Sequence, residues 1–373
     1  MTELSSPQAA SARLDMQAVD QLRPLGLALV ARRLLWASLA LAPVTMLVDG
    51  LVHPDKTALF VLAALSLIPL AWLIGEATEH AGEHTGARIG GLLNASFGNA
   101  PEVIIAVVAV SDNLPDVVRG SMAGSIVSNI LLVLGAALVL GTDNAELDRS
   151  SLLGQLGLVL VAVVLLLIPS VAGWHGDPNR HSLALLSIGP AVVLLGLYLV
   201  VTIADLKRRP AHKVTDSSGW SLRTSLVVLG ATTTATAVIS EILVHSLQAF
   251  AKAADLSEFF IAVVIVAIVG NAAEHGGAVV IARRGKMKLA TEIAISSSAQ
   301  VGLLVIPVVT LASFAFAHPL SLAFRPIELV AMGAAALFVG FVIRDGRARR
   351  WEGALLIAVY GGFVVWFLSA GDR

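Results

Sequence analysis

Two short segments, far apart in the chain, each place one carboxylate inside an otherwise apolar stretch. They read Gly-Asn-Ala-Pro-Glu at residues 98–102 and Gly-Asn-Ala-Ala-Glu at residues 270–274. A charge in lipid is costly, so an ionisable residue in such a stretch indicates a functional site. Because the two segments match, we expect Glu102 and Glu274 to form one shared site where two halves of the chain meet.

Glu102 and Glu274, if they lie side by side away from water, form an unfavourable pair of like charges. Burial and mutual repulsion both disfavour the charged state of a carboxyl group. Such a pair becomes tolerable by taking up either protons or a cation, and a site that exchanges one for the other is the basis of an antiporter. The alternative is a pair of structural carboxylates bound to a base, but no Lys or Arg lies at the centre of a predicted helix.

The ligand types around these carboxylates favour a hard cation. The chain has no cysteine, and the conspicuous groups are carboxylate, amide and hydroxyl oxygens. We expect Gly98 and Gly270 to interrupt their helices and free backbone carbonyls, and Pro101 cannot donate a backbone hydrogen bond. Oxygen ligands of this kind suit Ca²⁺ better than Mg²⁺, which keeps its waters. Sodium sites also use carbonyls, but two acidic groups favour a divalent ion.

The composition predicts a polytopic membrane protein built of α-helices. Of 373 residues, 57% are hydrophobic and 14% are charged, with a mean hydropathy of +0.84. Soluble domains carry about 25% charged residues. The Leu, Val, Ala and Gly richness fits helices better than the alternating strands of a β-barrel. The chain has no basic patch with interleaved aromatics that would indicate nucleic-acid binding. The absence of cysteine excludes disulfides and thiolate-ligated metals.

Apolar windows of about the 20 residues needed to cross a bilayer predict eleven transmembrane helices. The first window begins near Leu34, too far into the chain for a signal peptide, so we expect it to be retained. The windows are residues 33–52, 57–78, 91–111, 120–141, 152–172, 183–204, 222–245, 259–282, 289–313, 327–343 and 352–369.

The distribution of Lys and Arg predicts the topology. The basic residues of segments 1–32, 207–209, 283–288 and 344–350 all fall on one side of the membrane in this scheme. The positive-inside rule makes that side the cytoplasm, with the C-terminus on the opposite side. The acidic loop 143–149 is the exception, although acidic residues count little in that rule.

The same topology makes the two carboxylate-bearing helices antiparallel. A unit of five helices is odd in number, so its duplication within one chain inverts the second copy. We therefore predict one N-terminal helix plus two inverted five-helix repeats. The boundaries are a cytoplasmic segment 1–32, an extra first helix 33–56, repeat 1 at 57–204, a cytoplasmic linker 205–221 and repeat 2 at 222–373.

Two further matches between the halves support the duplication. Thr78-Glu79 corresponds to Ser240-Glu241, and the polar cluster 125–129 corresponds to 296–300. Both polar clusters lead into a run of Leu and Val.

These residues closely resemble the two repeat motifs of the CAX-type Ca²⁺/H⁺ antiporters of the cation/Ca²⁺ exchanger superfamily. The resemblance rests on Thr78-Glu79, on residues 90–102 and 270–275, and on the Ser/Asn and Ser/Gln clusters. It implies the one-plus-five-plus-five architecture and proton-driven calcium export. The linker 205–221 departs from many relatives because it lacks an acidic segment, so a regulatory calcium site there is not expected.

The resemblance also implies roles for individual residues. Glu102 and Glu274 would be the central exchange carboxylates, and Asn99 and Asn271 with the backbone near them would add ligands. The residues expected to line the site are Ser125, Asn129, Ser297 and Gln300. Those expected on the ion path are Glu79 and Glu241.

Several of these residues have an ordinary structural alternative. Asn99 and Asn271 could cap the helices that follow the breaks, since Asn caps well. The Ser, Asn and Gln clusters could hold helices together, and Glu79 and Glu241 could be solvated carboxylates near helix ends. His275, beside Glu274, could relay protons because histidine titrates near neutrality, or could be a hydrogen-bonded packing residue.

A rival motif belongs to a different class of protein. His80, Glu83 and His84 match His-x-x-Glu-His, a zinc-peptidase signature in which two histidines one helical turn apart bind the metal. This motif would indicate a membrane-embedded metalloprotease. The second half of the chain has no counterpart of it.

The sequence thus predicts a transporter rather than an enzyme. It would export cytoplasmic Ca²⁺ in exchange for H⁺ by alternating access, with no resident cofactor. The alternatives are a Na⁺-coupled Ca²⁺ exchanger or a Na⁺(K⁺)/H⁺ antiporter of the same superfamily. Short loops and the absence of an organelle-targeting segment predict a bacterial inner membrane, while the oligomeric state is left open.

Overall fold

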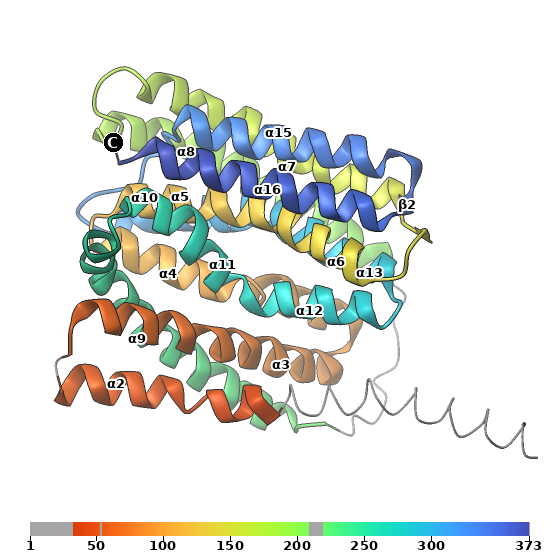
Figure 1. Ribbon diagram of the computed structural model, residues 1–373, viewed down its shortest axis with the longest axis horizontal. Coiled ribbons are helices and arrows are strands. Elements are labelled where there is room, and N and C mark those ends of the chain that lie inside the picture. Colours follow the sequence, from red (N-terminus) through yellow and green to blue (C-terminus); the bar gives the residue numbers. More distant parts are fainter. Residues whose placement is uncertain (1–32, 53, 209–218, 373) are drawn as a thin grey trace, which may run out of the picture.

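The computed structural model describes residues 33–52, 54–208 and 219–372. Most of its helices lie along one common direction (Figure 1). A short antiparallel pairing of β1 (Ala145–Glu146) with β2 (Arg347–Ala348) marks one end of the molecule, the hairpin end, and the C-terminus marks the opposite end. The expected segment 1–32 and most of the linker, residues 209–218, lie outside the described residues.

The described residues contain nine helices long and apolar enough to cross a membrane, and a tenth if one bent pair is counted as a single span. The bent pair is Glu258–Gly270 with Ala272–Arg283, which meet at an angle of 57°. The nine spans are Arg33–Leu51, Lys56–Thr85, Pro115–Leu140, Arg149–Gly173, His181–Lys207, Leu222–Ala254, Met287–Ala315, Pro326–Asp345 and Arg350–Ala370. The prediction of a multi-pass helical membrane protein is confirmed.

The helices fall into layers in the view of Figure 1. The lowest layer holds α2 (Leu41–Leu51), α3 (Lys56–Phe97) and α9 (Leu222–Ala254). The middle layer holds α4 (Ala100–Ser111), α11 (Ala267–Gly270) and α12 (Ala272–Arg283). Above them lie α5 (Pro115–Val127), α6 (Leu134–Leu140), α10 (Glu258–Phe260) and α13 (Met287–Gln300), then α7 (Arg149–Gly173), α8 (His181–Arg208), α15 (Pro326–Val342) and α16 (Arg350–Ala370).

One predicted helix has different bounds in the structure. The window 91–111 was expected to be a single span, but α3 continues without interruption to Phe97 and the 12-residue α4 begins at Ala100. No proline lies between Pro69 and Pro101, so nothing forces α3 to end earlier. Pro101 then occupies the first turn of α4, where its missing N–H costs nothing.

Three segments of the described part of the chain are wound as π-helix. They are η1 (Ser128–Val133), η2 (Ile261–Val266) and η3 (Val301–Val305). A π-helical turn inside an α-helix often marks a functional site. η1 follows α5 at the polar cluster 125–129, and η3 follows α13 at the matching cluster 296–300, before α14 (Ile306–Ala312). The polar clusters therefore lie where both helices change their winding.

Helix α5 packs closely against η2, in the second half of the chain, at Gly124. A Cβ atom on Gly124 would clash with the carbonyl oxygen of Val263 in η2, so only glycine permits this approach. Such small-residue contacts let helices pack closely in a membrane, where no hydrophobic force drives them together. The close approach brings Ser125, the next residue, to the centre of the bundle.

The acidic loop 143–149 meets the basic loops at the hairpin end. The backbone N–H of Arg350 donates to Asp143 at 3.0 Å, and Lys288 forms an ion pair with Glu146 at 3.7 Å. Arg347 donates to the side chain of Asn144 at 3.2 Å. The loop that departed from the positive-inside pattern thus lies among the positive charges of its neighbours.

Candidate functional site

The two matching turns Gly98-Asn99 and Gly270-Asn271 are breaks in helices, as the sequence predicted. Asn99 and Asn271 have almost the same backbone conformation, with φ of −95° and ψ of 14° and 7°. Each break is followed by a new helix, α4 or α12, and these two helices lead away from the middle of the molecule in opposite directions (Figure 1).

Glu102 and Glu274 both lie in the first turn of the helix that follows a break. A helix N-terminus carries partial positive charge, which favours an anionic side chain there. The two carboxylates are close enough to repel each other electrostatically. The structure therefore brings them together, each at the positive end of its own helix.

Several oxygen atoms at this place have no hydrogen-bond partner although they are buried. They are both carboxylate oxygens of Glu102, Oε2 of Glu274 and Oδ1 of Asn99. The carboxylate of Glu274 also accepts a hydrogen bond from the Ser297 hydroxyl. Buried polar atoms are normally satisfied, so a group of oxygens without donors is suited to bind protons or a hard cation.

Glu102 also borders a small cavity between α4, α5 and α11. Ser121 and Ser125 of α5 and Gly270 line it with Glu102. Its volume of about 10 Å³ holds about one water molecule. A Cβ atom on Gly270 would stand 3.6 Å from Cγ of Glu102, so the break in the second half packs directly against the carboxylate of the first.

A network of amides and hydroxyls joins the two halves beside Glu274. Asn271 Nδ2 donates to Ser125 Oγ at 2.8 Å. Asn129 Nδ2 donates to Asn271 Oδ1 at 3.2 Å and to Ser297 Oγ at 2.9 Å. His275 Nε2 lies 2.7 Å from Asn129 Oδ1 and must be the donor, because a carbonyl oxygen can only accept.

A second, smaller contact joins the halves on the other side. Asn99 Nδ2 donates to Gln300 Oε1 at 2.7 Å. Neither Asn99 nor Asn271 caps its helix with its side chain, so the capping alternative is wrong. The carbonyls of Asn99 and Asn271 are not freed by the breaks either, since the N–H groups of Val103 and His275 donate to them.

Glu79 and Glu241 do not reach the central group. Both side chains are exposed, the first on α3 and the second on α9. Glu241 instead lines a cavity of about 250 Å³ with Asp49, Lys56 and His245. His245 Nε2 lies 3.0 Å from a carboxylate oxygen of Asp112, which follows the last residue of α4. This cavity therefore lies near the C-terminal end, where α4 ends.

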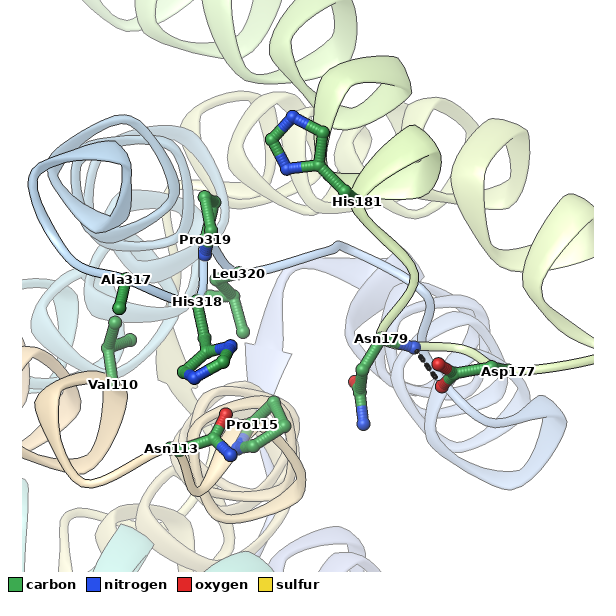
Figure 2. A pocket seen from close by; sticks show the side chains of 10 residues that line it. All are labelled: Val110, Asn113, Pro115, Asp177, Asn179, His181, Ala317, His318, Pro319 and Leu320. Carbon is green, nitrogen blue, oxygen red and sulfur yellow. Dashed lines mark hydrogen bonds between the residues drawn. The ribbon is translucent and has the colours of Figure 1, made fainter.

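Another cavity, of about 380 Å³, lies elsewhere (Figure 2). Figure 2 shows His318 and Asn113 on one side and Asn179 with Asp177 on the other. Asp177 is the one carboxylate on its wall and accepts from the backbone N–H of Asn179 at 2.8 Å. The cavity contains neither break and none of the carboxylates expected to exchange ions.

Arg119, a fully buried cation beside that cavity, was not predicted from the sequence. Its guanidinium donates to Asp116 at 2.8 Å and to Asn179 at 3.0 Å, and to the carbonyl and hydroxyl of Ser321 at 3.0 and 3.3 Å. The spacing of Asp116 and Arg119, three residues apart at the start of α5, was the available signal. Arg119 joins α5 to two loops at the C-terminal end.

The residues of the zinc-peptidase motif contact one another and Trp220 in the structure. His80, Glu83 and His84 all lie on α3; His80 contacts Glu83 at 3.3 Å, and His84 Nε2 lies 2.6 Å from the carbonyl oxygen of Trp220. The ring of Trp220 stands 5.0 Å from that of His80. Within the part of the chain that the structure describes, no three His, Asp or Glu side chains are placed to bind a metal ion.

The Asn129 network makes a testable prediction. Asn129→Ala removes hydrogen bonds to Asn271, Ser297 and His275 at once and leaves their partners buried, which costs on the order of 1–3 kcal/mol. We expect the cation concentration that half-saturates the site, measured by titration of the purified protein, to rise about tenfold or more. Ser128→Ala is the matched control, because Ser128 donates only to a carbonyl of its own helix. Equal behaviour of the two variants would contradict a role for the network.

The fold and this geometry define a multi-pass helical membrane protein with an oxygen-lined site between its halves. Among curated proteins, the Ca²⁺/H⁺ antiporter of Aphanothece halophytica is 33% identical over 352 residues, which cover 85% of this chain and 91% of the relative. The Ca²⁺/H⁺ antiporter ChaA of Bacillus subtilis is 36% identical over 326 residues, covering 84% and 92%.

Solved structures agree. The structure of native YfkE has a TM-score of 0.78 and 34% identity, covering 90% of this chain and 99% of that one. The H⁺/Ca²⁺ exchanger CAX shares the fold with a TM-score of 0.70 at 20% identity, covering 90% and 88%. The profile of the sodium/calcium exchanger protein family matches residues 56–206 and 224–369. The chain belongs to this family, and it is a transporter rather than an enzyme.

Proposed function

We propose that the protein exports cytoplasmic Ca²⁺ in exchange for H⁺. The observation that carries the proposal is the group of buried oxygens without donors, which Glu102, Glu274 and Asn99 contribute from both halves of the chain. Such a group accepts either protons or a hard divalent cation. The names of the relatives, which are Ca²⁺/H⁺ antiporters, support the same pair of ions.

The site would consist of the residues that the structure brings together. Glu102 and Glu274 would exchange Ca²⁺ for protons, and Asn99 would add its amide oxygen. Asn271, Ser125, Asn129, Ser297, Gln300 and His275 would position these groups through the hydrogen bonds described above. Gly98 and Gly270 would permit the breaks. Ca²⁺ and H⁺ are cargo, and the proposal includes no resident cofactor.

The architecture we propose is eleven membrane helices, one N-terminal helix followed by two inverted repeats of five. The end of α3 with α4 would form the broken third helix, as α10 to α12 form the broken eighth. Three observations support the repeats: the family profile matches twice, over 56–206 and 224–369; the two breaks share one backbone conformation; and η1 and η3 follow matching polar clusters. The repeats would be 57–204 and 222–373, joined by the linker 205–221.

The hairpin end would face the cytoplasm. It carries the basic residues of segments 283–288 and 344–350, which the positive-inside rule assigns to that side. The C-terminus would then lie on the opposite side and the N-terminus in the cytoplasm of a bacterial cell.

The charge state of Glu102 and Glu274 would decide when the site can switch from one side of the membrane to the other. With Glu102 and Glu274 open to the outer side, Ca²⁺ leaves and protons neutralise the carboxylates. A neutral or Ca²⁺-loaded site can pass the low-dielectric interior, so α3 and α9, which pack together, can move against the remaining helices and open the cytoplasmic side. The empty, doubly charged site resists this step, and that penalty couples the two ions.

The function is tested with the purified protein in proteoliposomes. An imposed pH gradient, acidic on the side that Ca²⁺ enters, should drive Ca²⁺ against its own gradient, and a Na⁺ gradient alone should not. Because one charge is worth about 2.3 kcal/mol per 100 mV, the effect of voltage reports the number of protons exchanged. Calcium movement driven by Na⁺ and insensitive to pH would overturn the proposal in favour of Na⁺-coupled exchange.

A further inference from the structure

The cavity of about 250 Å³ between α2, α3 and α9 is lined by charges of both signs. Asp49 of α2 and Glu241 of α9 contribute carboxylates, and Lys56 of α3 contributes an ammonium group. Within the described ranges, no ion pair or side-chain hydrogen bond joins any of the three to another residue. The cavity therefore keeps opposite charges apart that could otherwise neutralise each other.

The other charged groups at this cavity already contact each other. His245 is also on the wall, and its Nε2 lies 3.0 Å from a carboxylate oxygen of Asp112. The charged side chains of the wall that still lack a partner are Asp49, Lys56 and Glu241. An occupant that satisfies all three must present a cation to the two carboxylates and an anion to the lysine.

The cavity lies on the side of the bundle that faces lipid. Helix α2 is at the edge of the bundle (Figure 1), and along its length it buries Ala42 and Thr45 alone. Leu47 of α2 is 59% exposed, and Val238, on the wall of the cavity, is 40% exposed. In a membrane protein, apolar side chains exposed in this way contact lipid chains. A lipid therefore reaches this cavity from the bilayer.

The charged residues of α2 and α3 stand where a membrane span ends. Asp49 lies in the last turn of α2, and Lys56 is the first residue of α3. Both lie at the C-terminal end of the molecule (Figure 1), which is the outer side in the proposed topology. The polar headgroups of a bilayer lie at the ends of the spans, so the cavity opens at the level of the headgroups.

A zwitterionic headgroup with a primary ammonium matches the charges of the wall. Its phosphate oxygens accept from Lys56, and its ammonium has three N–H groups to donate to Asp49 and Glu241. A single water molecule needs about 10–15 Å³ of such space, so the cavity has room for a phosphate and an ethanolamine group. Charges at membrane depth are costly unless they are paired, and this headgroup pairs all three.

We propose that the cavity binds the headgroup of phosphatidylethanolamine from the outer leaflet, with its phosphate at Lys56 and its ammonium between Asp49 and Glu241. The acyl chains lie against the exposed apolar side chains of α2 and α9, such as Leu47 and Val238. The bound lipid joins α2, α3 and α9 near their outer ends. Lipid binding here does not depend on which ions the protein exchanges.

Native mass spectrometry of the purified full-length protein tests the site. Phosphatidylethanolamine, phosphatidylcholine and phosphatidylglycerol with the same acyl chains are titrated separately in detergent. Phosphatidylcholine has no N–H on its methylated ammonium, and phosphatidylglycerol has no ammonium. Each should bind about tenfold more weakly than phosphatidylethanolamine, the equivalent of one lost charge-assisted hydrogen bond.

Substitutions in the wall should change this selectivity. Lys56→Gln should weaken the binding of phosphatidylethanolamine about tenfold, and Asp49→Asn and Glu241→Gln should each reduce its advantage over phosphatidylcholine. Asp55→Asn and Lys252→Gln are the matched controls. These two residues are exposed charges near the same end of the molecule that do not line the cavity, so both variants should bind as the wild-type protein does.

Several results would overturn the proposal. Equal binding of the three lipids by the wild-type protein would mean unselective contact with lipid, and this comparison needs no substitution. Unchanged selectivity in all three wall variants would place the lipid elsewhere. Displacement of the lipid by an equal concentration of water-soluble phosphoethanolamine would assign the cavity to a soluble ligand. Because binding is measured without transport, a failure here is distinct from a failure of the proposed Ca²⁺/H⁺ exchange.

Discussion

Glu102→Gln and Glu274→Gln are each expected to abolish proton-coupled Ca²⁺ uptake into inverted membrane vesicles. Glutamine keeps the shape of the side chain but neither takes up a proton nor carries the charge that Ca²⁺ requires. Each substitution also removes one of the two charges whose repulsion we hold responsible for coupling. The measurement is Ca²⁺ uptake after the interior is acidified, at equal amounts of protein in the membrane.

Glu79→Gln is the matched control, since Glu79 is an exposed carboxylate on α3 that lies away from both breaks. It should retain at least part of the uptake. The vesicles with each variant should also keep their pH gradient, which excludes a leak. Near-normal uptake by both Glu102→Gln and Glu274→Gln would contradict the site as described.

The second large effect concerns stability. Arg119→Ala removes a fully buried guanidinium that donates to Asp116, Asn179 and Ser321, and it leaves these acceptors around a hole. We expect the free energy of unfolding to fall on the order of 3 kcal/mol. Thermal unfolding in detergent, followed by tryptophan fluorescence, would show a lower midpoint.

Lys252→Ala provides the comparison, because Lys252 is an exposed cation in the last turn of α9. Its midpoint should match that of the wild-type protein. Arg119 hydrogen-bonds to Asn179 beside the 380 Å³ cavity and not to the oxygen group at the breaks, so the folded fraction of Arg119→Ala should need the same Ca²⁺ concentration for half-maximal transport. An unchanged midpoint would contradict the structural role of Arg119.

Much of the site could be predicted because its signal is local. A carboxylate in an apolar stretch, a glycine before it and a second copy of the pattern require no knowledge of distant contacts. The breaks at Asn99 and Asn271 followed from the same residues. The pairing of Asn271 with Ser125, and of Asn99 with Gln300, could not be predicted in detail, because it depends on side-chain orientation after the helices have packed.

The continuity of α3 and the burial of Arg119 could not be predicted from the sequence, for a different reason. A hydropathy window ends where polar residues begin, but residues 79–97 stay helical because helix formation tolerates polar side chains. Arg119 stands just before an apolar window, where a charge is usually solvated. Only the fold reveals that two distant loops, which contribute Asn179 and Ser321, cover it.

The two halves match in sequence more closely than in hydrogen bonding. Glu274 accepts from Ser297, which is held by Asn129, whereas no other residue donates to Glu102. His275 follows Glu274, but an apolar Val103 follows Glu102. The two carboxylates therefore differ in their surroundings.

The pairing of β1 with β2 has a consequence for biosynthesis. Ala145 and Glu146 meet Ala348 and Arg347, and Asp143 meets Arg350, so these partners of the early loop are made only near the end of translation. Until then, the acidic loop has Lys288 as a basic partner but lacks Arg347 and Arg350. The pairing of β1 with β2 forms once the last loop has been synthesised, so a chain truncated before Arg347 should show faster proteolysis at residues 143–146.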